Sequence, residues 1–141
     1  MGNKLSSTDF LKLKEKAYLM MSNAYAPYSK FSVGAALLAN DKKIFGGCNV
    51  ENAAYPEGLC AEAGAISAMI AGGASIIEAI CVISKSEKIV SPCGGCRQKI
   101  REFSTEDTEI YLLNVKGEVK VFLIEDLLPF SFSEFDNISN H

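Results

Sequence analysis

The sequence predicts a three-layer α/β domain in which helices cover both faces of a central, mixed, five-stranded sheet. Its 141 residues are close to the roughly 150 expected of one domain, so residues 1–141 are expected to form a single domain. Hydrophobic residues make up 48% of the chain and charged residues 22%, which is enough for a buried core. Helical patterns alternate with short, mostly apolar strands, and this order is typical of a sheet covered on both faces.

The first part of the chain is expected to form a helix and a hairpin. Ser7 can cap an amphipathic helix that stops before Pro27. Residues 33–39 and 43–50 are apolar runs joined by Asn40-Asp41, a pattern that predicts a β-hairpin.

The second part of the chain alternates helices and strands. A helix rich in Ala, Ile and Met is predicted at 59–71, before Gly72-Gly73, and a second helix at 93–103. Strands are predicted at 76–84, 109–114 and 119–124. Residues 1–7 and 134–141 are expected to be flexible tails.

Charge and hydropathy argue against several classes of partner. The net charge is -3, so the chain lacks the overall positive field that favours nucleic acid or anionic membranes. The least charged stretch, 63–77, is too short to span a bilayer, and the N-terminus lacks the apolar core of a secretion signal. These features predict a cytoplasmic protein without a nucleic-acid or membrane partner.

Three cysteines occur at the starts of two predicted helices. Cys60 lies two residues before Glu62, and Cys93 and Cys96 belong to Pro92-Cys93-Gly94-Gly95-Cys96. Free backbone N–H groups and the helix dipole favour thiolate there. Three thiolates can hold Zn²⁺ and leave the fourth tetrahedral position open for water. Glu62 is then placed to move protons without binding the metal.

Other interpretations of the cysteines remain open from spacing alone. Cys93 and Cys96 alone are also compatible with a redox pair, and a zinc site can be purely structural. Cys48 and Cys81 lie in predicted strands and are expected to be core residues. His141 is the only histidine and lies in the C-terminal tail, so a ligand role is not expected.

Five segments in order resemble the small homotetrameric cytidine deaminases over about residues 8–133. The cysteine and glutamate spacing is that of the zinc deaminase signature in its three-cysteine form. The segments are Phe31-Ser32-Val33-Gly34-Ala35-Ala36-Leu37-Leu38, Cys48-Asn49-Val50-Glu51-Asn52-Ala53-Ala54-Tyr55-Pro56, Cys60-Ala61-Glu62, Ser91-Pro92-Cys93-Gly94-Gly95-Cys96-Arg97-Gln98 and Leu127-Leu128-Pro129.

The resemblance implies a role for each matching residue. It implies one Zn²⁺ per subunit on the three cysteines, proton transfer by Glu62, and a homotetramer whose subunits share active sites. It also implies that Phe31 stacks on the pyrimidine, that Asn49 and Glu51 bind the ribose hydroxyls, that the backbone at Ala61 reads the base, and that Ala53, Tyr55 and Phe132 reach a neighbouring site.

The chain departs from the family pattern at two places. Ala63 stands where many members have an Arg that offsets the thiolate charge, a task left to helix dipoles or Arg97. Phe130 and Phe132 both follow Pro129, and the spacing favours Phe132 as the aromatic residue of the shared site.

The implied activity is deamination of cytidine and deoxycytidine to uridine and deoxyuridine in pyrimidine nucleoside salvage. A deaminase for another cytosine nucleoside, such as blasticidin S, is the nearest alternative. A polynucleotide-editing deaminase fits less well, because the chain is short and acidic. A binding module with structural zinc is the alternative outside enzymes.

Overall fold

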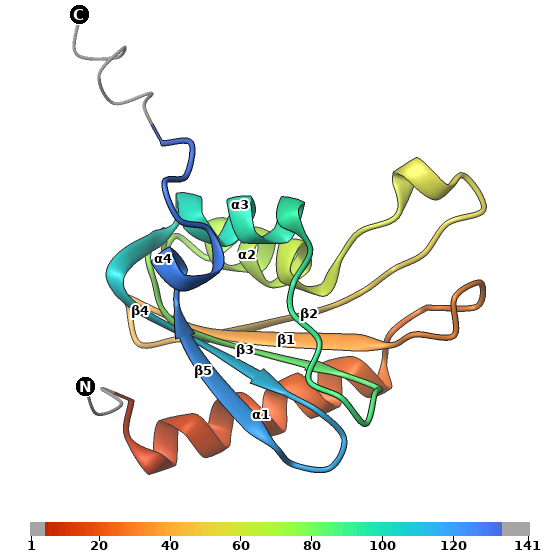
Figure 1. The fold of residues 1–141 in the computed structure, drawn as a ribbon, viewed down its shortest axis with the longest axis horizontal. Coiled ribbons are helices and arrows are strands. Elements are labelled where there is room, and N and C mark those ends of the chain that lie inside the picture. Colours follow the sequence, from red (N-terminus) through yellow and green to blue (C-terminus); the bar gives the residue numbers. More distant parts are fainter. Residues whose placement is uncertain (1–4, 134–141) are drawn as a thin grey trace, which may run out of the picture.

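The computed structural model describes residues 5–133 and contains the predicted three layers (Figure 1). The central sheet has the strand order β2-β1-β3-β4-β5. Only β3 and β4 are parallel, whereas the other neighbours are antiparallel, so the sheet is mixed as predicted. Its strands are β1 (Val33–Ala39), β2 (Ile44–Cys48), β3 (Ile77–Ser84), β4 (Ser104–Leu113) and β5 (Val119–Leu123).

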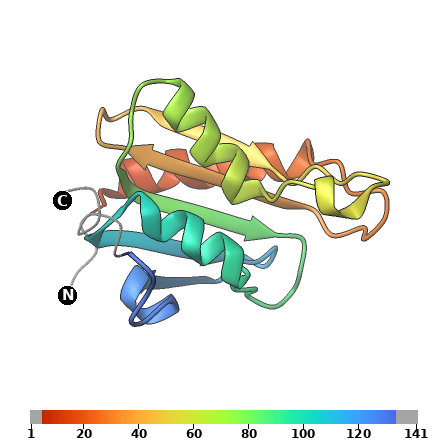
Figure 2. The same ribbon diagram turned by 90° about the horizontal axis from the view of Figure 1, so that it is seen from above.

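Helices cover both faces of the sheet. Helix α1 (Ser7–Ser22) lies on one face. Helices α2 (Ala61–Ala71), α3 (Gly94–Glu102) and α4 (Ile124–Leu127) lie on the other, where α2 and α3 run side by side (Figure 2). The segment before α2 contains a short 3₁₀ helix, η1 (Tyr55–Glu57), and extends beyond the sheet. Within residues 5–133 no helix combines the length and hydropathy needed to cross a membrane.

Some element boundaries differ from the sequence-based predictions. Ser6, not Ser7, caps α1, because its extended backbone lets its hydroxyl accept a 3.1 Å hydrogen bond from the Asp9 N–H. Leu5, Ser6 and Ser7 were expected to belong to the N-terminal tail, but Leu5 packs against the core beneath α1, Ser6 caps that helix and Ser7 is its first residue. Strand β4 begins at Ser104 rather than 109, since its polar first residues carry no apolar pattern. Helix α4 was not predicted, and residues 1–4 and 134–141 lie outside the described part of the chain.

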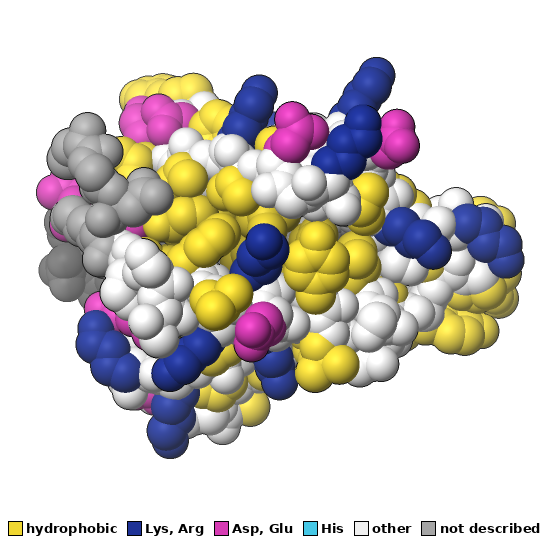
Figure 3. Space-filling view, turned by 90° about the horizontal axis from the view of Figure 1, so that it is seen from below, with side chains coloured by type: hydrophobic (Ala, Val, Ile, Leu, Met, Phe, Trp, Pro, Cys, Tyr) yellow, Lys and Arg dark blue, Asp and Glu magenta, His cyan; other side chains and the backbone are white. Residues whose placement is uncertain are grey.

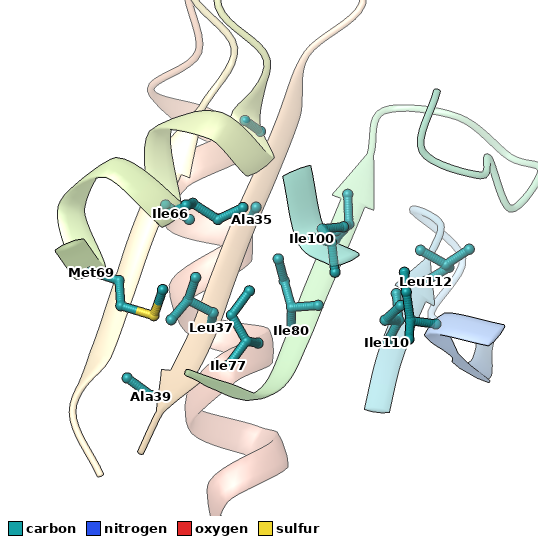
Figure 4. Close-up of a cluster of buried hydrophobic side chains, with 14 of the residues drawn as sticks. Ala35, Leu37, Ala39, Ile66, Met69, Ile77, Ile80, Ile100, Ile110 and Leu112 are labelled. Atoms are coloured by element: carbon teal, nitrogen blue, oxygen red, sulfur yellow. The ribbon is translucent and has the colours of Figure 1, made fainter. Parts of the chain in front are cut away.

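Alternating side chains of the central strands form two cores. Ile80 on β3 contributes to the cluster beneath α2 and α3 (Figure 4). Cys81 and Ile83 point the other way, into the cluster beneath α1. Cys81 is fully buried, which confirms its predicted core position. The prediction for Cys48 was wrong, because this residue ends the edge strand β2 and is only half-buried.

The outer surface of the α1 layer mixes side chains of different character. Lysines, arginines and acidic residues are interspersed with hydrophobic side chains (Figure 3). Leu11 and Leu19 on α1 and Val121 on β5 are among the exposed hydrophobic residues.

Two adjacent glycines let helices approach β2 from both sides. A Cβ atom at Gly47 would lie 2.3 Å from the backbone nitrogen of Ala65 and 2.6 Å from the carbonyl oxygen of Ala61. A Cβ atom at Gly46 would point the opposite way, toward the Met20 and Lys16 side chains of α1. The missing side chain at Gly47 thus allows α2, and the cysteine at its start, to sit directly on the edge strand.

Candidate active site

Helices α2 and α3 each start at a cysteine motif, and together they bring sulfur atoms and a carboxylate close to one another. Cys60 is the N-cap residue of α2 and Cys93 is that of α3. The Cys96 thiol donates a hydrogen bond to the Cys60 sulfur, with 2.8 Å between the two Sγ atoms. The Glu62 carboxylate belongs to the same cluster, in which the three ligand atoms lie within 4.8 Å of one another.

Cys93 lies at the edge of this cluster. It is exposed and falls outside the group within 4.8 Å, yet its side chain interacts with Cys96 and lines the same pocket. Two cysteine sulfurs are therefore in contact, a third cysteine lies beside them, and this donor set suits Zn²⁺.

Hydrogen bonding and burial perturb the ionisable groups of the cluster. The hydrogen bond from Cys96 lowers the pKa of Cys60 to about 6 against the opposing effect of burial, with help from the Ala63 backbone and the Lys99 charge. The same bond raises the pKa of Cys96, because that thiol holds the shared proton. Burial raises the pKa of Glu62, which is 4% exposed, and the Cys60 charge raises it further. Glu62 is therefore a carboxyl group that takes up a proton more readily than an ordinary glutamate.

A pocket of about 240 Å³ joins the cluster to an aromatic side chain. Phe31 lines it together with Glu62 and the three cysteines. Its other lining residues are Val33, Val82, Ser84, Val90, Ser91 and Pro92. Apolar walls with a few polar groups at one end are what a flat heterocyclic ring requires.

Asn49 fixes the backbone immediately after the Phe31 side chain. Its Nδ2 donates to the Phe31 carbonyl at 2.8 Å, and its Oδ1 accepts from the Val33 N–H at 2.9 Å. The amide thus holds the segment that presents the aromatic ring to the pocket.

Glu51 lines a second pocket, together with Tyr28 and Ser29 from the segment that precedes β1. Its Oε1 accepts from the backbone N–H groups of Tyr28 (3.0 Å) and Ser29 (3.1 Å), and its Oε2 accepts from the Ser29 hydroxyl. These bonds, led by that of the Ser29 hydroxyl, lower the pKa of Glu51. Tyr55 lines this second pocket, but Phe31 and Glu62 do not. Glu51 and Tyr55 therefore line a different pocket from Phe31 and Glu62, and Ser29, which bonds both the Glu51 carboxylate and the Phe31 N–H, connects the two.

The remaining residues predicted for the site lie in three different places. Ala61 is fully buried at the start of α2, next to Cys60. Ala53 is exposed in the segment before η1. Phe132 is 62% exposed, and its carbonyl accepts a 3.0 Å hydrogen bond from the Gln98 side chain of α3. Neither Ala53 nor Phe132 lines the two pockets described above.

Arg97 has a different task from the charge compensation expected of it. Its guanidinium donates to the Pro92 carbonyl (2.8 Å), the Leu127 carbonyl (2.6 Å) and the Ser91 hydroxyl (2.6 Å). It therefore ties the loop before α3 to α4. The positive charge that lowers the pKa of both Cys60 and Glu62 belongs instead to Lys99.

Sequence reasoning missed Lys99 and two serines. Lys99 lies one helical turn after Gly95, and its Nζ is 3.7 Å from where a Gly95 Cβ would be, so helical spacing signals its place beside the cysteines. Ser29 has a weaker signal, since a serine two residues before Phe31 can accept that residue's N–H, as it does at 3.0 Å. Ser84 ends an apolar strand, and nothing in the sequence distinguishes it.

Comparisons with known proteins identify the family that this chain matches. Residues 8–112 match the model of the cytidine and deoxycytidylate deaminase zinc-binding region. The cytidine deaminase of Sporosarcina psychrophila is 44% identical over 128 residues, which cover 91% of this chain and 94% of that protein. That of Halalkalibacterium halodurans is 39% identical over 124 residues, covering 88% and 94%. The crystal structure of cytidine deaminase from Burkholderia pseudomallei matches with a TM-score of 0.83 and 42% identity. The match covers 91% of this chain and 100% of that chain.

Proposed function

Because the chain belongs to the cytidine and deoxycytidylate deaminase family of hydrolases, we propose that it hydrolyses cytidine and deoxycytidine to uridine and deoxyuridine with release of ammonia. The observation that carries this proposal is the pocket that joins the Phe31 ring, the Glu62 carboxylate and three cysteines. The proposed physiological role is pyrimidine nucleoside salvage in the cytoplasm, carried out by a single domain spanning residues 1–141.

The three cysteines are proposed to hold one Zn²⁺ per chain. Cys60 and Cys96 are adjacent through their sulfur atoms, and Cys93 lies beside Cys96. A set of three thiolates matches the preference of Zn²⁺ for sulfur ligands. When bound, zinc supplies the Lewis acidity that makes water nucleophilic near neutral pH.

Glu62 is proposed to carry the protons. It takes a proton from the attacking water and delivers it to N3 of the pyrimidine ring. After oxygen has bonded to C4, Glu62 takes the remaining proton of that new hydroxyl and gives it to the amino group; the C4–N bond then breaks, ammonia leaves, and the oxygen becomes the C4 carbonyl of the product. The burial of Glu62 favours its protonated form, so the carboxyl group can act as acid as well as base.

Residues in and around the two pockets are proposed to hold the nucleoside. Phe31 stacks on the base, the backbone at Ala61 reads its polar edge, and Asn49 and Glu51 bind the ribose hydroxyls. Glu51 accepts three hydrogen bonds within the chain, and a carboxylate has about four acceptor positions. One position therefore remains for a sugar hydroxyl.

We propose a homotetramer in which subunits complete each other's sites. The support is the exposure of hydrophobic side chains around η1 and near the C-terminus, where Tyr55 is 75% exposed, Leu59 58% and Phe132 62%. Exposed aromatic and aliphatic side chains of this kind can supply the apolar contacts of a subunit interface. Ala53, Tyr55 and Phe132 would then contact nucleoside in a neighbouring subunit, with Phe132 preferred to Phe130.

A spectrophotometric assay tests the proposed reaction. Zinc-loaded protein should lower the absorbance of cytidine as uridine forms. Glu62→Gln should keep zinc and fold while losing about 10²-fold to 10⁴-fold or more in kcat, the range for one acid-base group. Wild-type protein without cytidine turnover, or Glu62→Gln with full turnover, would refute the proposal. Turnover of blasticidin S but not of cytidine would favour the alternative nucleoside.

Mixing two inactive variants tests the shared sites. Glu62→Gln subunits lack the proton carrier, and Phe132→Ala subunits lack the aromatic side chain. If a site takes Glu62 from one chain and Phe132 from another, mixed tetramers should regain activity. A fully active monomer in light scattering would contradict the proposed sharing.

A further inference from the structure

Ser84 is a buried polar side chain that faces the pocket without a hydrogen-bond partner among the described residues. It ends β3, is 4% exposed, and lines the same pocket as Phe31 and Glu62. Among the buried side-chain oxygen and nitrogen atoms of residues 5–133, the Ser84 Oγ is the one that forms no hydrogen bond. A buried hydroxyl without a partner is costly, and proteins rarely retain one without a reason.

The residues around Ser84 indicate what kind of molecule could be its hydrogen-bond partner. Val33, Val82 and Val90 supply apolar pocket wall. Ser91 is exposed and its hydroxyl accepts from Arg97, and the cysteines form the proposed zinc site. Apart from Glu62, Ser84 is therefore the buried residue of this pocket whose polar side chain remains available to bind a molecule that enters it.

We propose that the Ser84 hydroxyl is a hydrogen-bond partner of the pyrimidine ring bound in this pocket. This inference rests on the proposed function, since it takes the ligand to be a cytosine nucleoside. A hydroxyl group both donates and accepts. It can accept from the amino group of cytosine and, after rotation, donate to the carbonyl oxygen that replaces that group in uracil. Ser84 thus contacts substrate and product with the same atom.

Substitution of Ser84 should have opposite effects on stability and on catalysis. Ser84→Ala removes an unpartnered buried hydroxyl and keeps the Cβ atom, so the melting temperature of the nucleoside-free protein should stay the same or rise. The variant should lose about two- to tenfold in kcat/KM for cytidine, the value of one neutral hydrogen bond. Inhibition by uridine should weaken by a similar factor. Ser84→Thr, which keeps the hydroxyl, should retain more activity than Ser84→Ala.

Ser104 provides a matched control. Its hydroxyl donates to the Ile100 carbonyl at 2.6 Å and lies outside the pocket. Ser104→Ala should lower the melting temperature and leave kcat/KM unchanged, the reverse of the Ser84 pattern.

Two results would overturn the inference while leaving the proposed function intact. One is an active wild-type protein whose Ser84→Ala variant keeps the same kcat/KM and the same uridine inhibition, because the hydroxyl would then have water as its partner in every state. The other is a loss of activity accompanied by a lower melting temperature, which would show a structural role. A wild-type protein that does not deaminate cytidine refutes the proposed function itself.

Discussion

Replacement of Gly47 by alanine should separate α2 from the edge strand and disturb the cysteine at the start of that helix. The new Cβ would lie 2.3 Å from the Ala65 nitrogen, 2.6 Å from the Ala61 oxygen and 2.7 Å from the Gly64 carbonyl carbon. All three are backbone atoms of α2, so the clash cannot be relieved by a change of rotamer. Relief requires the helix, with Cys60 at its start, to move.

The expected cost follows from the cost of overpacking. Inserting a methyl group into a packed interior costs about 1–3 kcal/mol, and the backbone contacts place Gly47→Ala at the upper end, about 3 kcal/mol. A chain of this size loses about 4 °C of melting temperature per kcal/mol. Gly47→Ala should therefore melt roughly 12 °C lower than the wild type in calorimetry, and it should bind less zinc per chain.

Gly46→Ala is the matched control on the same strand. Its Cβ would lie 2.8 Å from Met20 Cγ and 2.9 Å from Lys16 Cε, atoms of flexible side chains that can turn away. Neither glycine has a positive φ, so both variants gain the same small benefit from a less flexible unfolded chain. Gly46→Ala should melt within about 4 °C of the wild type, a difference of about 1 kcal/mol. Equal melting temperatures for the two variants would refute the close packing of α2 on β2.

The remaining predictions concern the cysteines and their electrostatic environment. Cys93→Ser should lose zinc and melting temperature relative to Cys48→Ser, because part of the metal's binding energy is folding energy; full zinc content in Cys93→Ser would argue against its role as a ligand. Lys99→Gln should release zinc to a chelator faster than Lys99→Arg, which keeps the positive charge, and equal release rates would contradict the compensating role. In metal-free protein Cys60, with a pKa of about 6, is mainly thiolate above that pH. It should react with iodoacetamide at about pH 7 and more slowly at about pH 5. Cys81, whose pKa burial raises to about 12, should stay unmodified at both, and its modification in folded protein, detected by peptide mass spectrometry, would contradict the structure.

Local sequence patterns were sufficient to predict the layers and most elements. The hairpin, the central strand and the two helices begun by cysteine motifs carry their own periodicity and end signals, so β1 and β3 fall within one residue of the predicted strands. The cysteine and glutamate spacing likewise singled out Cys60, Glu62 and Cys96, whose ligand atoms lie within 4.8 Å of one another. These features depend on residues close together in the chain, and a sequence records such neighbours directly.

The tertiary structure decided which groups share a pocket and which are left unpartnered. Glu51 accepts hydrogen bonds from Tyr28 and Ser29 in the segment before Phe31, and it lines a different pocket from that aromatic ring. Arg97 bonds to loop and α4 atoms instead of offsetting the thiolates, and Ser84 becomes a buried hydroxyl facing the pocket. The physical reason is that each of these outcomes depends on contacts between distant segments, which form only when the sheet brings them together.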